Sequence, residues 1–246
     1  MHMEDFSRYA YLGYENDFDN ISNSQCKIPW YPWVGVNYVN SKNRIMIIGE
    51  THYSNEAEPE KIAQSLIDCA NNRNFTKEVI MESGIRLDWR NKMLDGLYSA
   101  LFGKNILLDS ERIRFWQSIS FYNFIQRPME YNTKKKERPT EKDFYEGWRT
   151  FVNLVSILKP KQVIFIGVQA MYLMHDALNG IGVKHEITSI KKVDRAYSRC
   201  GWLEYDGCRV DLISIRHTSR FFSWVKWNEE LNCYMPEIMK NLKNFV

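Results

Sequence analysis

The segment Gly49-Glu50-Thr51-His52-Tyr53 combines side chains that acid–base and charge-stabilising chemistry uses. A carboxylate such as Glu50 can stabilise positive charge or activate water, and an imidazole such as His52 can move protons near neutral pH. The segment directly follows an apolar run, so we expect a short loop anchored by a buried strand, where packing alone does not explain polar residues. The alternative is a structural loop in which Glu50 accepts backbone hydrogen bonds and His52 lies at the surface.

A second polar cluster surrounds His217, which follows another apolar run. Arg216 and Arg220 flank this histidine, and Phe221 and Phe222 come next. A basic and aromatic loop suits phosphates together with unstacked bases. The alternative is an aromatic cluster that completes the core, with the histidine at its edge.

Asn123, in the segment FYNFIQRP, is a third candidate. Its amide offers both a donor and an acceptor, so it can read the edge of a base or of another amide. Most asparagines at strand ends form turns, which is the alternative here.

Three apolar runs predict the strands that position these side chains. They are Ile45–Ile48 followed by Gly49, the segment QVIFIG at 162–167, and the segment RVDLISI at 209–215. Runs of this kind are typical of strands covered by helices on both faces. In parallel sheets, ligands bind outside the carboxyl ends of the strands, where the Glu50 and His217 loops stand.

Helical patterns separate the predicted strands. One helix begins at Pro59 and ends at Asn71-Asn72, a second is capped by Thr140 and runs to Pro160, and a third covers Gln169–Leu178. The segment 115–125 fits either a strand or an extended loop. The sequence therefore predicts an α/β, three-layer sandwich, with a central, mostly parallel sheet of about four strands, as a single domain over residues 1–246.

Composition narrows the classes of function. No stretch reaches the roughly 18 apolar residues that span a bilayer, and the acidic, polar N-terminus is unlike a signal peptide, so we expect a cytoplasmic protein without a membrane partner. The five cysteines are scattered without CxxC spacing and the five histidines show no HExxH spacing, which predicts reduced thiols, no metal and no cofactor. Nothing in the sequence defines an oligomeric state.

A net charge of +3 does not establish a polyanionic partner, but the basic residues fall in runs. Each run taken alone is best interpreted as a solvated surface. The runs are Lys134, Lys135, Lys136 and Arg138; Lys184, Lys191, Lys192, Arg195 and Arg199; and Arg216 and Arg220.

Four segments together resemble the uracil-DNA glycosylase superfamily, in a fixed order between Trp30 and Trp224. They are IIGETHY, FYNFIQRP, the run RPTEKDFYEGWRTFVNLVSILKPKQVIFIGVQA, and ISIRHTSRFF. The first is similar to the family's Gly-Gln/Glu motif, the second to its Asn segment ending in Arg-Pro, the third to its helix, Lys-Pro, strand and Gly-x-x-Ala run, and the last to its His-Pro-Ser strand end. The resemblance implies a DNA-binding protein that acts on a flipped base.

The resemblance also implies roles for individual residues. His217 stabilises negative charge on the departing base, and Glu50, or nearby His52, serves the sugar side. Asn123 reads the base, and Thr51 lies with Gly49 and Tyr53 where the base is held. The expected DNA contacts are Arg127, Arg216, Ser219, Arg220, Phe221 and Phe222.

Three positions depart from the family's pattern. Thr51 stands where the most active members carry aspartate, and His52 and Thr218 replace prolines. Threonine cannot act as a carboxylate base, so either Glu50 or His52 takes over, or catalysis is slow or lost. The lack of paired cysteines excludes the iron–sulfur branch of the superfamily.

These departures leave three hypotheses. The first is a glycosylase that hydrolyses the N-glycosidic bond of uracil or another modified base. The second is an inactive module on the same fold that binds nucleic acid or a nucleotide. The third is an unrelated hydrolase using Glu50 and His52, because Gly-Glu-Thr-His is also similar to the Gly-Glu-x-Thr-His element of erythromycin esterase-like proteins.

Overall fold

The computed structural model describes residues 4–24, 28–54, 58–104, 107–130, 137–219 and 221–245. The helices are α1 Glu4–Ser7, α2 Glu15–Ser24, α3 Pro59–Asn71, α4 Phe75–Val79, η1 Ile80–Arg86 (a π-helix), α5 Lys92–Phe102, α6 Asp109–Ser118, α7 Glu141–Leu158, α8 Gln169–Tyr172, α9 Met174–Asn179, α10 Trp224–Tyr234 and α11 Pro236–Phe245. The strands are β1 Trp33–Val34, β2 Ile45–Gly49, β3 Tyr53–Ser54, β4 Ser120–Asn123, β5 Met129–Glu130, β6 Gln162–Ile166, β7 Lys184–Val193, β8 Ala196–Tyr205 and β9 Cys208–Ile215.

The main sheet is mixed, with the strand order β1-β4-β2-β6-β9-β8-β7. The four inner strands β4, β2, β6 and β9 are parallel, whereas β1, β8 and β7 each pair antiparallel with their inner neighbour. A separate short parallel pair joins β3 to β5. The α/β class is confirmed, but the expected strand number is wrong, since the sheet has seven strands rather than about four.

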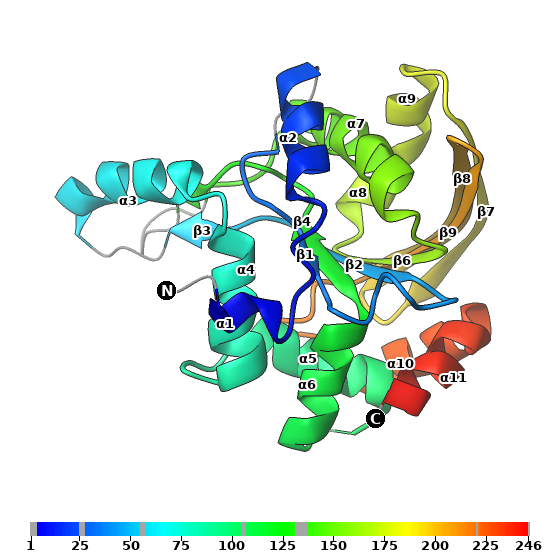
Figure 1. Cartoon of the computed structure of the whole chain (residues 1–246). Coiled ribbons are helices and arrows are strands. Elements are labelled where there is room, and N and C mark those ends of the chain that lie inside the picture. The colour runs from blue at the N-terminus through cyan, green and yellow to red at the C-terminus, as the bar shows by residue number, and fades with distance from the viewer. Residues whose placement is uncertain are drawn as a thin grey trace.

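Helices cover both faces of the sheet (Figure 1). On one side α5, α6, α10 and α11 pack on the sheet around Trp116 and Trp227, and on the other side α2, α7, α8 and α9 pack around Trp148 and Phe165. The strands β2 and β6 are buried almost throughout, as their unbroken apolar runs predict. No helix of the described residues is long and apolar enough to cross a membrane.

The predicted helices are largely confirmed. The helix α3 begins at Pro59, and Thr140 caps α7 in a reciprocal capping box with Asp143. The segment 169–178 forms two short helices that meet at Leu173 rather than one. The undecided segment 115–125 divides between the end of α6 and the strand β4.

The strands β7 and β8 were not predicted, because neither contains an unbroken apolar run: β7 is mostly exposed, and β8 mixes buried with partly exposed positions. They form a hairpin that extends the sheet beyond β9, at an edge where one face meets water. Charged residues are tolerated at such positions, so the basic run at 184–199 lies on a largely exposed strand pair, which agrees with its interpretation as a solvated surface.

Candidate functional site

The parallel strands end together and place the three candidate segments at one edge of the sheet. Gly49 pairs with Asn123, Ile48 with Phe165, and Ile166 with Ile215. The residues after these strand ends are therefore level with one another. Neighbouring strands lie about 4.8 Å apart, so the chain after β9, which carries His217, is about 10 Å from the Glu50 loop.

Asn123 is buried at this edge, with 4% of its surface exposed. Its side chain lies directly over Gly49, where a Cβ atom would overlap the amide oxygen. Glycine at 49 thus makes room for the amide. Within the described part of the chain the backbone carbonyl of Asn123 accepts a hydrogen bond from Gln126 Nε2 (2.6 Å), but the side-chain amide forms none. The amide is not completely enclosed, so it remains open to a hydrogen bond with a ligand or water.

Glu50 lines a small hollow between the strand ends of β2 and β6 and the helices α7 and α8. Its other lining residues are mostly apolar, and include Phe124, Phe144 and Phe165. The hollow has a volume of about 10 Å³, which is room for one water molecule and not for a base. His217 is not among its lining residues.

Gly167 lines the same hollow beside Glu50. Its φ of +127° belongs to a region that only glycine adopts readily, and a Cβ atom there would lie 3.3 Å from Glu50 Oε2. Its N–H donates to the carbonyl of Ile215 (2.9 Å), which links the end of β6 to the end of β9. Gly167 thereby keeps the space between the Glu50 and His217 loops free of side chains. Sequence reasoning identified the strand that ends at Gly167 but not this role.

His217 is partly exposed, and Ser219 fixes the state of its ring. The hydroxyl and the backbone N–H of Ser219 lie 2.9 Å and 3.4 Å from His217 Nδ1. A backbone N–H can only donate, so this contact favours Nδ1 as the acceptor and Nε2 as the nitrogen that carries the proton. His217 Nε2 is then a hydrogen-bond donor, as stabilisation of a departing base requires.

Thr218 stabilises the His217 loop where the family pattern has proline. Its hydroxyl donates to the carbonyl of Met93 (2.6 Å) at the start of α5, and the side chain is buried. Gly96 on the same helix lies so close to the Thr218 carbonyl that a Cβ atom would overlap it. The loop is therefore anchored by packing and a hydrogen bond rather than by a proline ring.

His52 turns away from the Glu50 hollow into an aromatic cluster. Its ring packs edge-on against Trp30 and Phe75, with centroid distances of 4.9 Å and 4.7 Å, and its Nε2 lies 3.2 Å from the Thr76 hydroxyl. Burial lowers the pKa of His52 to about 3. A buried, neutral imidazole packed in this way does not suit the catalytic role expected of it.

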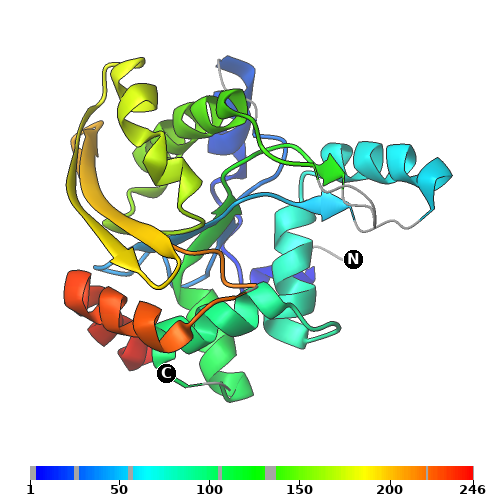
Figure 2. The ribbon, with the colours of Figure 1, turned by 180° about the vertical axis from the view of Figure 1, so that it is seen from behind.

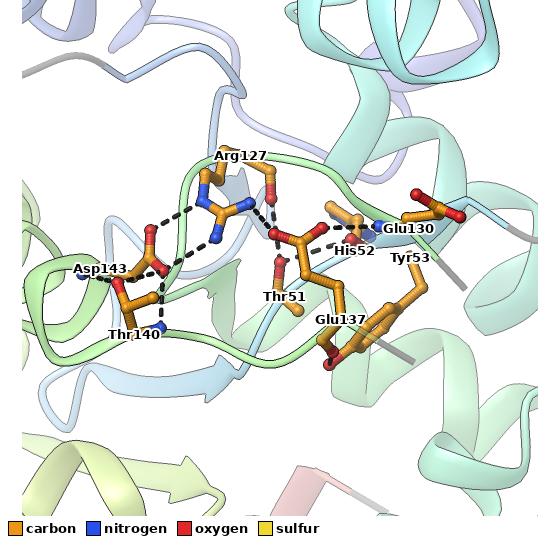
Figure 3. Close-up of polar contacts among 8 residues, drawn as sticks. All are labelled: Thr51, His52, Tyr53, Arg127, Glu130, Glu137, Thr140 and Asp143. Carbon is orange, nitrogen blue, oxygen red and sulfur yellow. Dashed lines mark hydrogen bonds and ion pairs between the residues drawn. The ribbon is translucent and has the colours of Figure 1, made fainter. Parts of the chain in front are cut away.

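Thr51, Tyr53 and Arg127 belong to one polar network beside the site (Figure 3). The Thr51 hydroxyl donates to the carbonyl of Arg127 (3.0 Å), and the Tyr53 hydroxyl donates to the carbonyl of Glu137 (3.4 Å). Burial, together with the negative charge of Glu50, raises the pKa of Tyr53 to about 12. These hydroxyls brace the loop and do not point into a base-sized cavity.

The guanidinium of Arg127 is held by two carboxylates. Asp143 accepts from Nε and Nη2 at 2.7 Å and 2.9 Å, and Glu137 accepts from Nη1 at 2.6 Å (Figure 3). The bonds from Arg127, opposed by partial burial, hold the pKa of Asp143 at about 2. An arginine paired in this way is unsuited to the phosphate contact expected of it, because its charge is already compensated.

The two phenylalanines after His217 have different environments. Phe221 is 73% exposed, with a strained φ of +51°, whereas Phe222 stacks on the buried Trp227 at a centroid distance of 6.2 Å. Only Phe221 is therefore available for contact with a nucleic acid. Arg216 is partly exposed and forms no ion pair with any described residue, and Arg220 lies outside the described residues.

No cluster of three or more histidine, cysteine, aspartate or glutamate side chains able to hold a metal ion occurs among the described residues. No protein-family model matches the chain, and no curated protein matches its sequence.

Proposed function

We propose that this protein binds DNA and recognises a base flipped out of the stack, with Glu50 and His217 hydrolysing the N-glycosidic bond of uracil or another modified base. The observation that carries this proposal is the amide of Asn123, which is packed over Gly49 beside Glu50 and forms no hydrogen bond with a described residue. An amide donor and acceptor fixed by packing can read the edge of a base. Few other ligands require that pair of groups together with a carboxylate and an exposed aromatic side chain.

Different side chains stabilise the charge that develops on the base and the charge that develops on the sugar. As the bond between the base nitrogen and C1′ breaks, its electron pair moves to the base, where His217 Nε2–H donates to the developing negative charge. Glu50 stabilises the positive charge on the sugar and accepts a proton from the water whose oxygen bonds to C1′. Both groups follow parallel strands on either side of Gly167, so the base would lie over that glycine.

The proposal places the protein on a uracil-DNA glycosylase-like fold. Its support is the four-stranded parallel core and the meeting of the three motif segments at the carboxyl edge of that core. A base enters only after side chains such as Phe124 or Phe144 move, because the hollow beside Glu50 holds about one water molecule.

A second candidate function is recognition of a base without hydrolysis. One observation favours it: the Thr51 hydroxyl, at the position where the most active family members carry aspartate, is engaged by the carbonyl of Arg127. The esterase-like alternative has lost its support, because His52 does not line the Glu50 hollow and is buried among aromatic rings.

The test is release of free base from oligonucleotides that contain uracil, hypoxanthine or another modified base. We expect His217→Ala to lower single-turnover release about 10²- to 10³-fold, the usual cost of one transition-state donor. Asn123→Asp should lower release and change the order of preference among bases, because it replaces an amide donor with a carboxylate.

The matched control is His175→Ala, since His175 lies on α9 and bonds to Asn179 and His185. It should retain wild-type release. Release unaffected by His217→Ala would contradict the catalytic assignment. DNA binding without release from any base, weakened by Asn123→Asp, would identify the non-hydrolytic module instead.

A further inference from the structure

Arginines without ion pairs gather at the carboxyl edge of the sheet, beyond the residues that the proposed reaction uses. Arg195 follows the end of β7, and Arg199 lies on β8; neither forms an ion pair with a described residue. Two other cations of the same hairpin are compensated, since Lys184 pairs with Glu204 at 2.7 Å and Lys191 pairs with Glu230, whereas Lys192, next to the turn, forms no ion pair with a described residue. The uncompensated charge is therefore confined to one end of the hairpin.

Each of these arginines lies over an exposed aromatic ring. The guanidinium carbon of Arg199 is 4.9 Å from the centroid of Tyr172, which is 60% exposed, and that of Arg195 is 5.6 Å from the centroid of Phe221. A guanidinium held over a ring face keeps N–H groups available for a further partner. We call these four residues the Arg195–Arg199 strip.

The strip is continuous with the candidate site. Phe221 lies four residues after His217, Tyr172 ends the helix that follows Gly167, and the backbone N–H of Arg199 donates to Ser214 Oγ (3.1 Å) near the end of β9. Figure 2 shows the turn between β7 and β8 beside the segment that follows β9. From β2 to β7 the sheet spans about 19 Å, the length of five or six base-pair steps.

We infer that the Arg195–Arg199 strip binds the sugar–phosphate backbone of the nucleic acid several nucleotides away from the recognised base. Arginines that form no ion pair suit phosphodiester oxygens, and the carboxylate nearest in sequence, that of Asp194, is paired with Lys226. The exposed rings of Tyr172 and Phe221 give the same surface apolar faces on which unstacked bases can lie. This inference rests on the proposed nucleic-acid function, and it assigns to the hairpin β7–β8 a part in substrate binding.

The experiment measures binding of fluorescein-labelled single-stranded and duplex oligonucleotides by fluorescence anisotropy over a series of salt concentrations. Losing two phosphate contacts through Arg195→Ala/Arg199→Ala should reduce the slope of log K against log salt by about 1.8 for duplex and about 1.4 for single strands. The series, duplex or single-stranded, in which the slope falls by the expected amount identifies the form of DNA that binds to the strip. Tyr172→Ala should weaken single-stranded binding more than duplex binding, because bases in a duplex are already stacked.

Arg209→Ala is the matched control. Arg209 also lies over an aromatic ring, Trp202, at 4.2 Å, but it is paired with Glu204 and lies at the opposite end of the hairpin. Its slope should equal that of the wild type. If the slope of log K against log salt falls in the double variant but not in Arg209→Ala, the result supports phosphate binding by the strip, whether or not any base is released.

An unchanged slope in the double variant would overturn the inference that the strip binds the sugar–phosphate backbone. If base release persists in that case, the proposed function stands without it. Absence of nucleic-acid binding by the wild-type protein would overturn both the strip and the proposed function.

Discussion

At the scale of single residues, burial separates the two histidines that the sequence makes equally attractive. His217 stays at a partly exposed loop with its Nδ1 fixed by Ser219, whereas His52 is enclosed by Trp30 and Phe75. The same imidazole group is therefore open to solvent at the edge of the sheet in His217 and packed between aromatic rings in His52. The difference arises from neighbours distant in sequence.

His52 makes the stability of the protein sensitive to acid. Its pKa is about 3 in the folded protein and about 6.5 when unfolded, so the unfolded state binds the extra proton between these values. This contribution is fully present above pH 6.5 and decreases as the pH falls toward 3. Near pH 5 it should have lost about 2 kcal/mol. Urea unfolding at several pH values, comparing wild type with His52→Gln, measures the difference; parallel pH profiles would contradict it.

At the scale of elements, the network around Arg127 fastens the start of α7 to the strand-end loop of the site. Arg127 follows β4, Asp143 lies in the first turn of α7, and Thr51 follows β2. Asp143 also accepts from the N-cap residue Thr140 at 2.8 Å, so a single carboxylate caps the helix and holds the arginine. The position of Glu50 thus depends on contacts between three elements.

Replacing Arg127 by glutamine should lower the free energy of unfolding at neutral pH by about 1 kcal/mol, a modest loss because the arginine is 40% exposed and solvent screens the pair. The pKa of Asp143 is lowered to about 2 from 3.8. The stabilisation of the folded state by the Arg127–Asp143 pair is therefore fully present above about pH 4 and is lost as the pH falls through 2. Denaturant titrations at neutral and acidic pH measure this effect. Lys142→Gln, at an exposed pair on the same helix, should cost less than 0.5 kcal/mol; an equal cost would refute a special role for Arg127.

At the scale of the whole molecule, helix α2 is joined to helix α4 through a buried cation. Lys77 on α4 is only 2% exposed, pairs with Glu15 on α2, and lies 4.9 Å from the centroid of Tyr31. Burial lowers the pKa of Lys77, and the bond to Glu15 opposes that shift. Segments far apart in sequence therefore share one charge pair.

Glu15→Gln should cost about 3 kcal/mol of folding free energy, because it leaves the Lys77 charge buried without a partner. The double variant Glu15→Gln/Lys77→Met should recover most of this loss, since it removes the charge as well. Thermal and urea unfolding of both variants, with Glu58→Gln at the exposed Lys61 pair as control, measure the difference. Equal losses in the single and double variants would show that the charge is not the cause.

Local sequence patterns were sufficient to predict the α/β class, the central strands β2, β6 and β9, the helices α3 and α7, and the loops that carry Glu50 and His217. These features depend on local patterns, namely apolar runs, caps and glycine stops, which do not require knowledge of distant residues. The hairpin β7–β8 has no unbroken apolar run, because a strand pair with one face in water tolerates charged residues.

Which polar residues face the site depends on the tertiary structure. It buried His52 among aromatic rings, engaged Arg127 with Asp143, stacked Phe222 on Trp227, and left the amide of Asn123 without a partner. It also brought Arg195 and Arg199 beside the His217 loop. The physical reason is that burial, ion pairing and pKa depend on which segments meet in space, and those contacts join residues that are far apart in the chain.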